Sequence, residues 1–141
     1  MMAPTEFSDD RWCMACGEEN PQGLHLKFRF EGDDCVCDFL PERVHQGWAG
    51  VVHGGILATL LDEVMNQALC LTVGPVVTAQ LNVRYRKPAP TGESLRVSAR
   101  VTGGRGKLHE AEAEVTLADG TVVASGTAKL MEVEGDLGTA Q

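Results

Sequence analysis

Long apolar runs are missing from this chain of 141 residues, and no stretch reaches the roughly 18 apolar residues that a membrane span requires. Positive charge is also scarce, because 12 lysines and arginines stand against 20 acidic residues and give a formal net charge of −8. That balance opposes general binding to nucleic acid. We therefore expect neither a membrane nor a nucleic acid among the partners.

The N-terminal residues MMAPTEFSDDRW are acidic and lack the apolar segment of a secretory signal. Five cysteines are an odd number, and without an export signal they favour reduced thiols over a disulfide framework. We expect a cytoplasmic protein. The length suits one domain covering residues 1–141, with frayed ends at about 1–10 and 134–141.

Apolar and polar residues alternate with the period of a half-buried strand in most of the chain. The predicted strands are 24–31, 35–40, 80–86, 95–101, 109–117 and 121–133. Turn sequences such as Gly32-Asp33-Asp34 and Asp119-Gly120 join consecutive strands, which must then be antiparallel. The sequence therefore predicts an antiparallel sheet with one wet and one dry face.

A helix from about Ile56 to about Thr72 separates the second strand from the third, and Gly74-Pro75 ends it. This segment is apolar on nearly every side, which is typical of a helix buried in a core. We expect an α+β fold in which the sheet curls around one central helix.

Two carboxylates, Asp62 and Glu63, interrupt this apolar helix. A bare carboxylate in a core costs several kcal/mol, so each should be paired, protonated or placed at a cavity. Helical spacing puts Asp62 on a small, polar stripe with Gly55 and Asn66, which suits a crevice. Glu63 shares a line with Gln67 and is interpreted as a structural or interface acid.

The helix is preceded by His53-Gly54-Gly55. The first N–H groups of a helix lack internal partners, and glycines allow an oxygen to approach them, so they could form an oxyanion hole. Asp62 lies about 10 Å further along the axis and could activate water or attack a carbonyl directly. The alternative is a tight loop-to-helix turn with Asp62 satisfied by a neighbouring amide or hydroxyl.

Four stretches together resemble one known family: CMACGEENPQGLHLKF, HQGW, HGGILATLLDEVM and VVTAQLNVRYRKPAP. They are similar to the hotdog-fold acyl-CoA thioesterases, in particular the 4-hydroxybenzoyl-CoA and phenylacetate-pathway group, over residues 13–131. The resemblance implies a long central helix wrapped by a roughly six-stranded antiparallel sheet. It also implies a homodimer or homotetramer with active sites between subunits. The reaction would release a free acid and coenzyme A from an acyl-CoA or aryl-CoA thioester, without cofactor or metal.

The same resemblance assigns roles to single residues. Asp62 matches the general base or nucleophile, and Gly54, alone or together with Gly55, matches the N–H donor that polarises the thioester carbonyl. His53 matches the histidine that shapes this turn. Thr78 matches a hydroxyl that orients the attacking water and reaches the site from the partner subunit.

Further residues are candidates for the substrate pocket. His45 and Trp48, in the loop before the helix, and Asn66 are expected to line it. Some relatives carry Asn or Gln about six residues before the motif histidine. Here Gly47 stands at that place with Gln46 beside it, so Gln46 is left out of the catalytic set.

Seven of the 12 basic residues fall between positions 84 and 107, where Glu93 is the single acid. Such a zone on an acidic protein suggests a small anionic ligand. We expect Arg84, Arg86 and Arg105 to contact the phosphates of coenzyme A. The alternative is that these arginines only line the wet face of the sheet.

Cys13-x-x-Cys16 invites a zinc hypothesis, but a second Cys-x-x-Cys is missing, and Cys35-x-Cys37 lies in a strand. Buried, inert thiols are the preferred interpretation, Cys70 is assigned to the core, and no metal site is predicted. Two rival functions remain for the whole chain. One is a hotdog protein that holds an acyl thioester or aromatic ligand without turnover, and the other is an acyl-thioester dehydratase.

Overall fold

The structure is a computed structural model that describes residues 6–136. Its elements are β1 (Phe7–Ser8), β2 (Arg29–Glu31), β3 (Asp34–Phe39), the 3-10 turn η1 (Arg43–His45), α1 (Gly54–Cys70), β4 (Val76–Tyr85), β5 (Leu95–Arg105), β6 (Leu108–Thr116), β7 (Val122–Glu132) and β8 (Gly135–Asp136).

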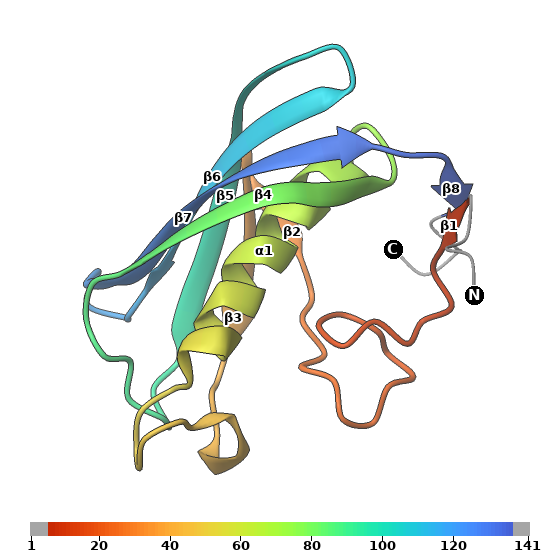
Figure 1. The fold of residues 1–141 in the computed structure, drawn as a ribbon. Coiled ribbons are helices and arrows are strands. Elements are labelled where there is room, and N and C mark those ends of the chain that lie inside the picture. The colour runs from red at the N-terminus through yellow and green to blue at the C-terminus, as the bar shows by residue number, and fades with distance from the viewer. Residues whose placement is uncertain (1–5, 137–141) are drawn as a thin grey trace.

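Six strands form one antiparallel sheet in the order β2-β3-β5-β6-β7-β4, and α1 crosses one face of it (Figure 1). The predicted α+β architecture, a central helix against a six-stranded antiparallel sheet, is confirmed. Because the strand that follows the helix pairs with β7 and not with β3, β4 lies at one edge of the sheet.

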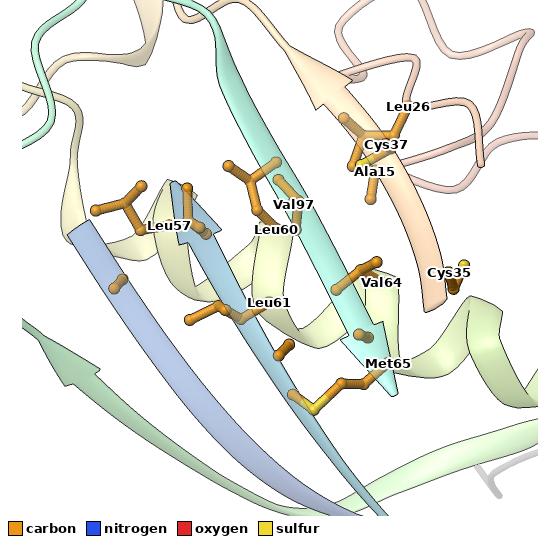
Figure 2. Packing of buried hydrophobic residues seen from close by; sticks show 14 of the residues in the cluster. Ala15, Leu26, Cys35, Cys37, Leu57, Leu60, Leu61, Val64, Met65 and Val97 are labelled. Carbon is orange, nitrogen blue, oxygen red and sulfur yellow. The ribbon is translucent and has the colours of Figure 1, made fainter. Parts of the chain in front are cut away.

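The core fills the space between α1 and the sheet. Leu60, Leu61, Val64 and Met65 of the helix are fully buried against the sheet, and Val97 of β5 lies beside Leu60 (Figure 2). Burying each such side chain contributes roughly 1.5–3 kcal/mol. Apolar contacts therefore hold the helix in place, and its few polar side chains can lie outside the core.

Helix α1 ends at Cys70, two residues before the predicted end. Gly74 adopts a φ of 113°, a backbone conformation that favours glycine, and the chain reverses there into β4. Strand β4 then starts at Val76, earlier than predicted.

The predicted strand over residues 24–31 is wrong in its first half. Only Arg29–Glu31 pair with β3, because His25 has a φ of 53° and breaks the extended conformation. The Leu26 N–H instead donates to Ala15 O (3.0 Å), and both residues are buried in the core. The alternation of this segment thus reflects the packing of a loop.

The ends of the described part of the chain, which fall within the ranges expected to fray, lie side by side. Strands β1 and β8 form a short parallel pair, and the Phe7 N–H donates to Glu134 O (3.0 Å). Residues 1–5 and 137–141 lie outside the described part of the chain. No helix within residues 6–136 is long and apolar enough to cross a bilayer.

Candidate active site

Three polar side chains meet beside the middle of α1. The Thr78 hydroxyl donates to Asp62 Oδ1 at 2.6 Å, and Asn66 Nδ2 lies 3.3 Å from the same oxygen and 2.9 Å from Thr78 Oγ1. Oδ1 is thus anchored by two donors. No residue between 6 and 136 is recorded as a donor to Oδ2, which leaves that oxygen available to a water molecule.

Local structure explains this meeting. Asn66 follows Asp62 by one helical turn, so the two side chains share a face of α1. Thr78 is the β4 partner of the buried Leu130, and this register turns it toward the helix. The register shifts between Thr78 and Gln80, and such bulges re-aim side chains next to a site.

Thr78 belongs to the same chain as the carboxylate that it contacts. The expectation that it reaches the site from a partner subunit differs from this arrangement, because its single hydroxyl proton is donated to Asp62 of the same chain. Asn66, expected in the substrate pocket, is engaged by the same pair.

The start of α1 offers a different group. His53 is the N-cap, and its Nδ1 accepts the Gly55 N–H at 2.8 Å, so that N–H is occupied. The Ile56 N–H donates to His53 O. The Gly54 N–H has no hydrogen-bond acceptor among the residues that the structure describes. Of the two predicted donors, Gly54 is therefore the one free to bind a substrate oxygen.

Both glycines are required by close neighbours. A Cβ at Gly55 would lie 3.0 Å from His53 Nδ1, inside the cap. A Cβ at Gly54 would lie 3.3 Å from the Tyr85 ring, whose hydroxyl donates to Gly54 O at 2.8 Å. Tyr85 was missed as a site residue from the sequence, although it lies within the motif VVTAQLNVRYRKPAP.

A cavity of about 410 Å³ lies at the start of α1 and is lined by Gly47, Trp48, Val52, His53 and Gly54. Trp48 is 85% exposed, which is unusual for a side chain of its size. Trp48, which was predicted to line the pocket, and the free Gly54 N–H therefore border the same cavity.

His45 does not line this cavity. Its Nδ1 accepts the Glu42 N–H at 2.9 Å, and its ring packs edge-on against Phe39 at 5.0 Å. The Gln46 side chain is also engaged, because Oε1 accepts the Gly50 N–H at 3.1 Å. Both residues shape the loop.

The helix start and the acidic centre are separate within one chain. Asp62 follows Gly54 by eight positions, or about 12 Å of helix. A thioester group is too small to contact both at hydrogen-bond distance. Within one chain the two groups therefore cannot act on the same thioester carbonyl at hydrogen-bond distance.

The predicted arginines do not form one anion site. Arg84 and Arg86 lie on the outer face of the sheet, opposite α1, and Arg86 Nε donates to Ser125 Oγ at 3.1 Å. The groove there, about 740 Å³, is also lined by Arg100 and Glu112. A surface of mixed charge is consistent with the alternative interpretation, in which these arginines only line the solvent-exposed face of the sheet.

Arg105 lies elsewhere. It pairs with Leu108 at the hairpin between β5 and β6, and Leu108 in turn pairs with Met131 of β7. Arg84 instead pairs with Ser125 of β7. Six residues along β7 separate these two positions, which is about 20 Å. The three guanidinium groups of one chain are too far apart to clamp one phosphate.

The five cysteines differ in burial, and Cys70, which was assigned to the core, is half-buried and packs against it. Cys35 and Cys37 are completely buried, and burial raises the pKa of their thiols to about 11 and about 12. The prediction of buried thiols is confirmed for these two. Cys13 and Cys16 are half-buried and lie beside Glu63. A hydrogen bond from Cys16 lowers the pKa of the Cys13 thiol to about 5, and burial raises the pKa of Glu63.

A helix across a six-stranded antiparallel sheet, with an anchored carboxylate on that helix and a free N–H at its start, defines a hotdog-fold protein with the elements of an acyl-transfer site. The family model described as Thioesterase superfamily matches residues 49–124, which is more than half of the chain. The chain belongs to this superfamily.

Similar proteins agree with this membership. Human acyl-coenzyme A thioesterase 13 is 35% identical over 68 residues, which are 47% of this chain and 49% of that protein. The chain spans about half the length of the curated relatives it matches. A solved thioesterase superfamily protein has a TM-score of 0.81 and 28% identity, covering 86% of this chain and 61% of the other. Mouse thioesterase superfamily member 2 has a TM-score of 0.70 and 27% identity, covering 77% and 83%.

Proposed function

We propose that this protein hydrolyses an acyl-CoA or aryl-CoA thioester to the free acid and coenzyme A. The observation that carries the proposal is the Asp62 carboxylate, held at Oδ1 by Thr78 and Asn66 with Oδ2 free. The names of the relatives, which include acyl-coenzyme A thioesterases, support this substrate class.

In the proposed reaction, Asp62 accepts a proton from water while the water oxygen bonds to the thioester carbon. The negative charge on the carbonyl oxygen is bound by the Gly54 N–H at the positive end of the helix dipole. The carbon–sulfur bond then breaks, and the proton held by Asp62 passes to the departing thiolate. Direct attack by Asp62 is the second route to the same products. Neither route requires a cofactor or a metal ion.

We propose that the active unit is a homodimer, in which the Gly54 N–H of one chain faces the Asp62 carboxylate of the other. The separation of about 12 Å between these groups within one chain supports this arrangement. The long free edge of β4, next to Thr78, suits pairing with a second copy. The exposed Trp48 would then wall a pocket between subunits.

A cytoplasmic location and a single domain over residues 1–141 are part of the proposal. The five cysteines, none of them in a disulfide, suit a reducing compartment. Any role of Arg84 and Arg86 in binding the coenzyme A phosphates would require a substrate that passes around the β4 edge. Arg105 would have to contact a different part of the substrate from the part that Arg84 and Arg86 contact.

The test is free-thiol release from a panel of aryl-CoA and alkyl-CoA thioesters. We expect Asp62→Asn to lower kcat by about 10²–10⁴-fold with the fold intact by circular dichroism. Asp33→Asn, which changes an exposed turn, is the matched control and should keep wild-type activity. Binding of acyl-CoA to both proteins without thiol release would favour the rival function, a ligand-binding protein without turnover.

A further inference from the structure

A second cluster of reactive side chains lies on another face of α1. The Cys13 and Cys16 sulfur atoms and a Glu63 carboxylate oxygen all lie within 4.8 Å of one another. The cysteines belong to the loop before β2, whereas Glu63 is 50 residues further along the chain than Cys13. The hydrolysis proposed above uses none of these three groups.

The loop presents its sulfur atoms in a fixed geometry. The Ala15 and Cys16 N–H groups donate to Cys13 Sγ at 3.3 and 3.5 Å. The Gly17 N–H donates to Cys13 O at 2.9 Å, and a Cβ at Gly17 would overlap the Cys13 backbone. Such N–H to sulfur bonds favour the thiolate, which is the form that binds a metal.

Glu63 is a half-buried acid without a cation beside it among the described residues. Its recorded contacts are Gln67 Nε2 at 3.1 Å and Cys13 Sγ at 4.0 Å, and no ion pair within residues 6–136 includes it. Removing water from an unpaired carboxylate is unfavourable. A positive charge among these three groups would remove that cost.

Gln67 points to the same place. It is only 6% exposed, and its Oε1 has no hydrogen-bond partner, while its Nε2 lies 3.7 Å from Cys16 Sγ. The amide oxygen and nitrogen are interchangeable in shape, and rotation of the group by half a turn aims Oε1 at the cluster. A cation bound by the cluster could then take Gln67 Oε1 as its fourth ligand.

We propose that Cys13, Cys16 and Glu63 bind one Zn²⁺ ion, with Gln67 Oε1 or a water as the fourth ligand. Two thiolates and one carboxylate carry three negative charges, which the ion reduces to one. Tetrahedral Zn–S bonds of about 2.3 Å place two sulfur atoms about 3.8 Å apart, so the cluster needs to contract by roughly 1 Å or less. Binding releases the thiol protons to solvent.

The ion would tie the N-terminal loop to α1. A cavity of about 230 Å³ runs along this junction and is lined by Cys13, Cys16, Glu63 and Gln67, together with Asn66. The site is structural, because it has no recorded contact with Asp62 Oδ2 or the Gly54 N–H. Loss of the ion should make the N-terminal loop less stable and should leave the positions of Asp62 and Gly54 largely unchanged.

The experiment starts from reduced protein comprising residues 1–141 that has been stripped with a chelator and is then titrated with Co²⁺, followed by Zn²⁺. We expect one Co²⁺ per chain, with a sulfur-to-cobalt charge-transfer band in the near ultraviolet that one equivalent of Zn²⁺ abolishes. Cys13→Ser and Cys16→Ser should lose the band. Cys70→Ala removes a thiol outside the cluster and should keep it. Glu63→Gln should weaken Co²⁺ binding at least tenfold.

A second measurement decides the matter if a serine variant does not fold. In wild-type protein, Zn²⁺ should protect Cys13 and Cys16 from alkylation, as mapped by mass spectrometry, and leave Cys70 unprotected. No charge-transfer band from protein with five titratable thiols would overturn the proposal. A Cys13–Cys16 disulfide that persists in reductant would also overturn it and would indicate a redox pair.

Discussion

The Thr78 hydroxyl donates to Asp62 Oδ1 at 2.6 Å and accepts from Asn66 Nδ2 at 2.9 Å. This chain of two hydrogen bonds joins the edge strand β4 to the centre of α1. The orientation of the carboxylate therefore depends on the placement of β4.

Thr78→Val keeps the shape of the side chain and removes the hydroxyl. We expect kcat to fall by about 10²-fold, because a misplaced catalytic group loses its alignment with the reacting carbon. KM should change little. Thr78→Ser retains the hydroxyl and should stay close to wild type, and steady-state kinetics on one acyl-CoA would measure all three. Equal activity of the valine variant would contradict a positioning role for this hydrogen bond.

Gly55→Ala should have opposite effects in two backgrounds. In the wild type, the new Cβ lies 3.0 Å from His53 Nδ1, so the variant should lose the N-cap and about 1 kcal/mol of unfolding free energy. In a His53→Ala background that conflict is absent, and alanine should stabilise the helix by up to about 1 kcal/mol over glycine. Urea unfolding of the four proteins measures the change of sign.

A mixing experiment tests the division of the site between chains. Asp62→Asn and Gly54→Val are each expected to be inactive, the second because a branched side chain covers the N–H group. Random exchange of a 1:1 mixture makes half of the dimers mixed, and each mixed dimer has one intact site, so about a quarter of wild-type activity should return. No recovery, with exchange verified by mass spectrometry, would place both groups in one chain.

Alkaline pH should destabilise the fold through its buried thiols. Burial raises the pKa of Cys37 to about 12, whereas an unfolded thiol has a pKa of about 8.5. Between these values the folded chain holds more protons than the unfolded chain, so the free energy of unfolding falls as pH rises above about 8.5. Cys37→Ala should reduce this slope, as measured by urea unfolding at several pH values. Identical slopes would exclude Cys37 as the cause.

The main elements of the fold could be predicted from the sequence because a buried face imposes its period on each strand. The same rule failed at Leu24 and Leu26, which alternate with polar residues and yet lie in a loop. Periodicity records which side chains are buried and not which backbone groups pair. The positive φ of His25 is what distinguishes this loop from a paired strand, and the sequence pattern does not predict it.

The site shows the same division. Asp62 and Asn66 follow from helical spacing alone. The contact of Thr78 with its own chain's carboxylate depends on where β4 docks and on the bulge after it. Glu63 and Cys13 are 50 residues apart, and spacing carries no information about a contact between two such segments. The unexplained acid and the Cys-x-x-Cys were both visible, but only the folded chain joins them.

The position of β4 also bears on the order in which the chain acquires its activity. Thr78 follows Asp62 by 16 residues, yet the strand that holds β4 in register, β7, ends at Glu132. Closing that long loop is slow compared with forming α1. A chain emerging from the ribosome would therefore complete its helix early but orient its carboxylate only after β7 has been made.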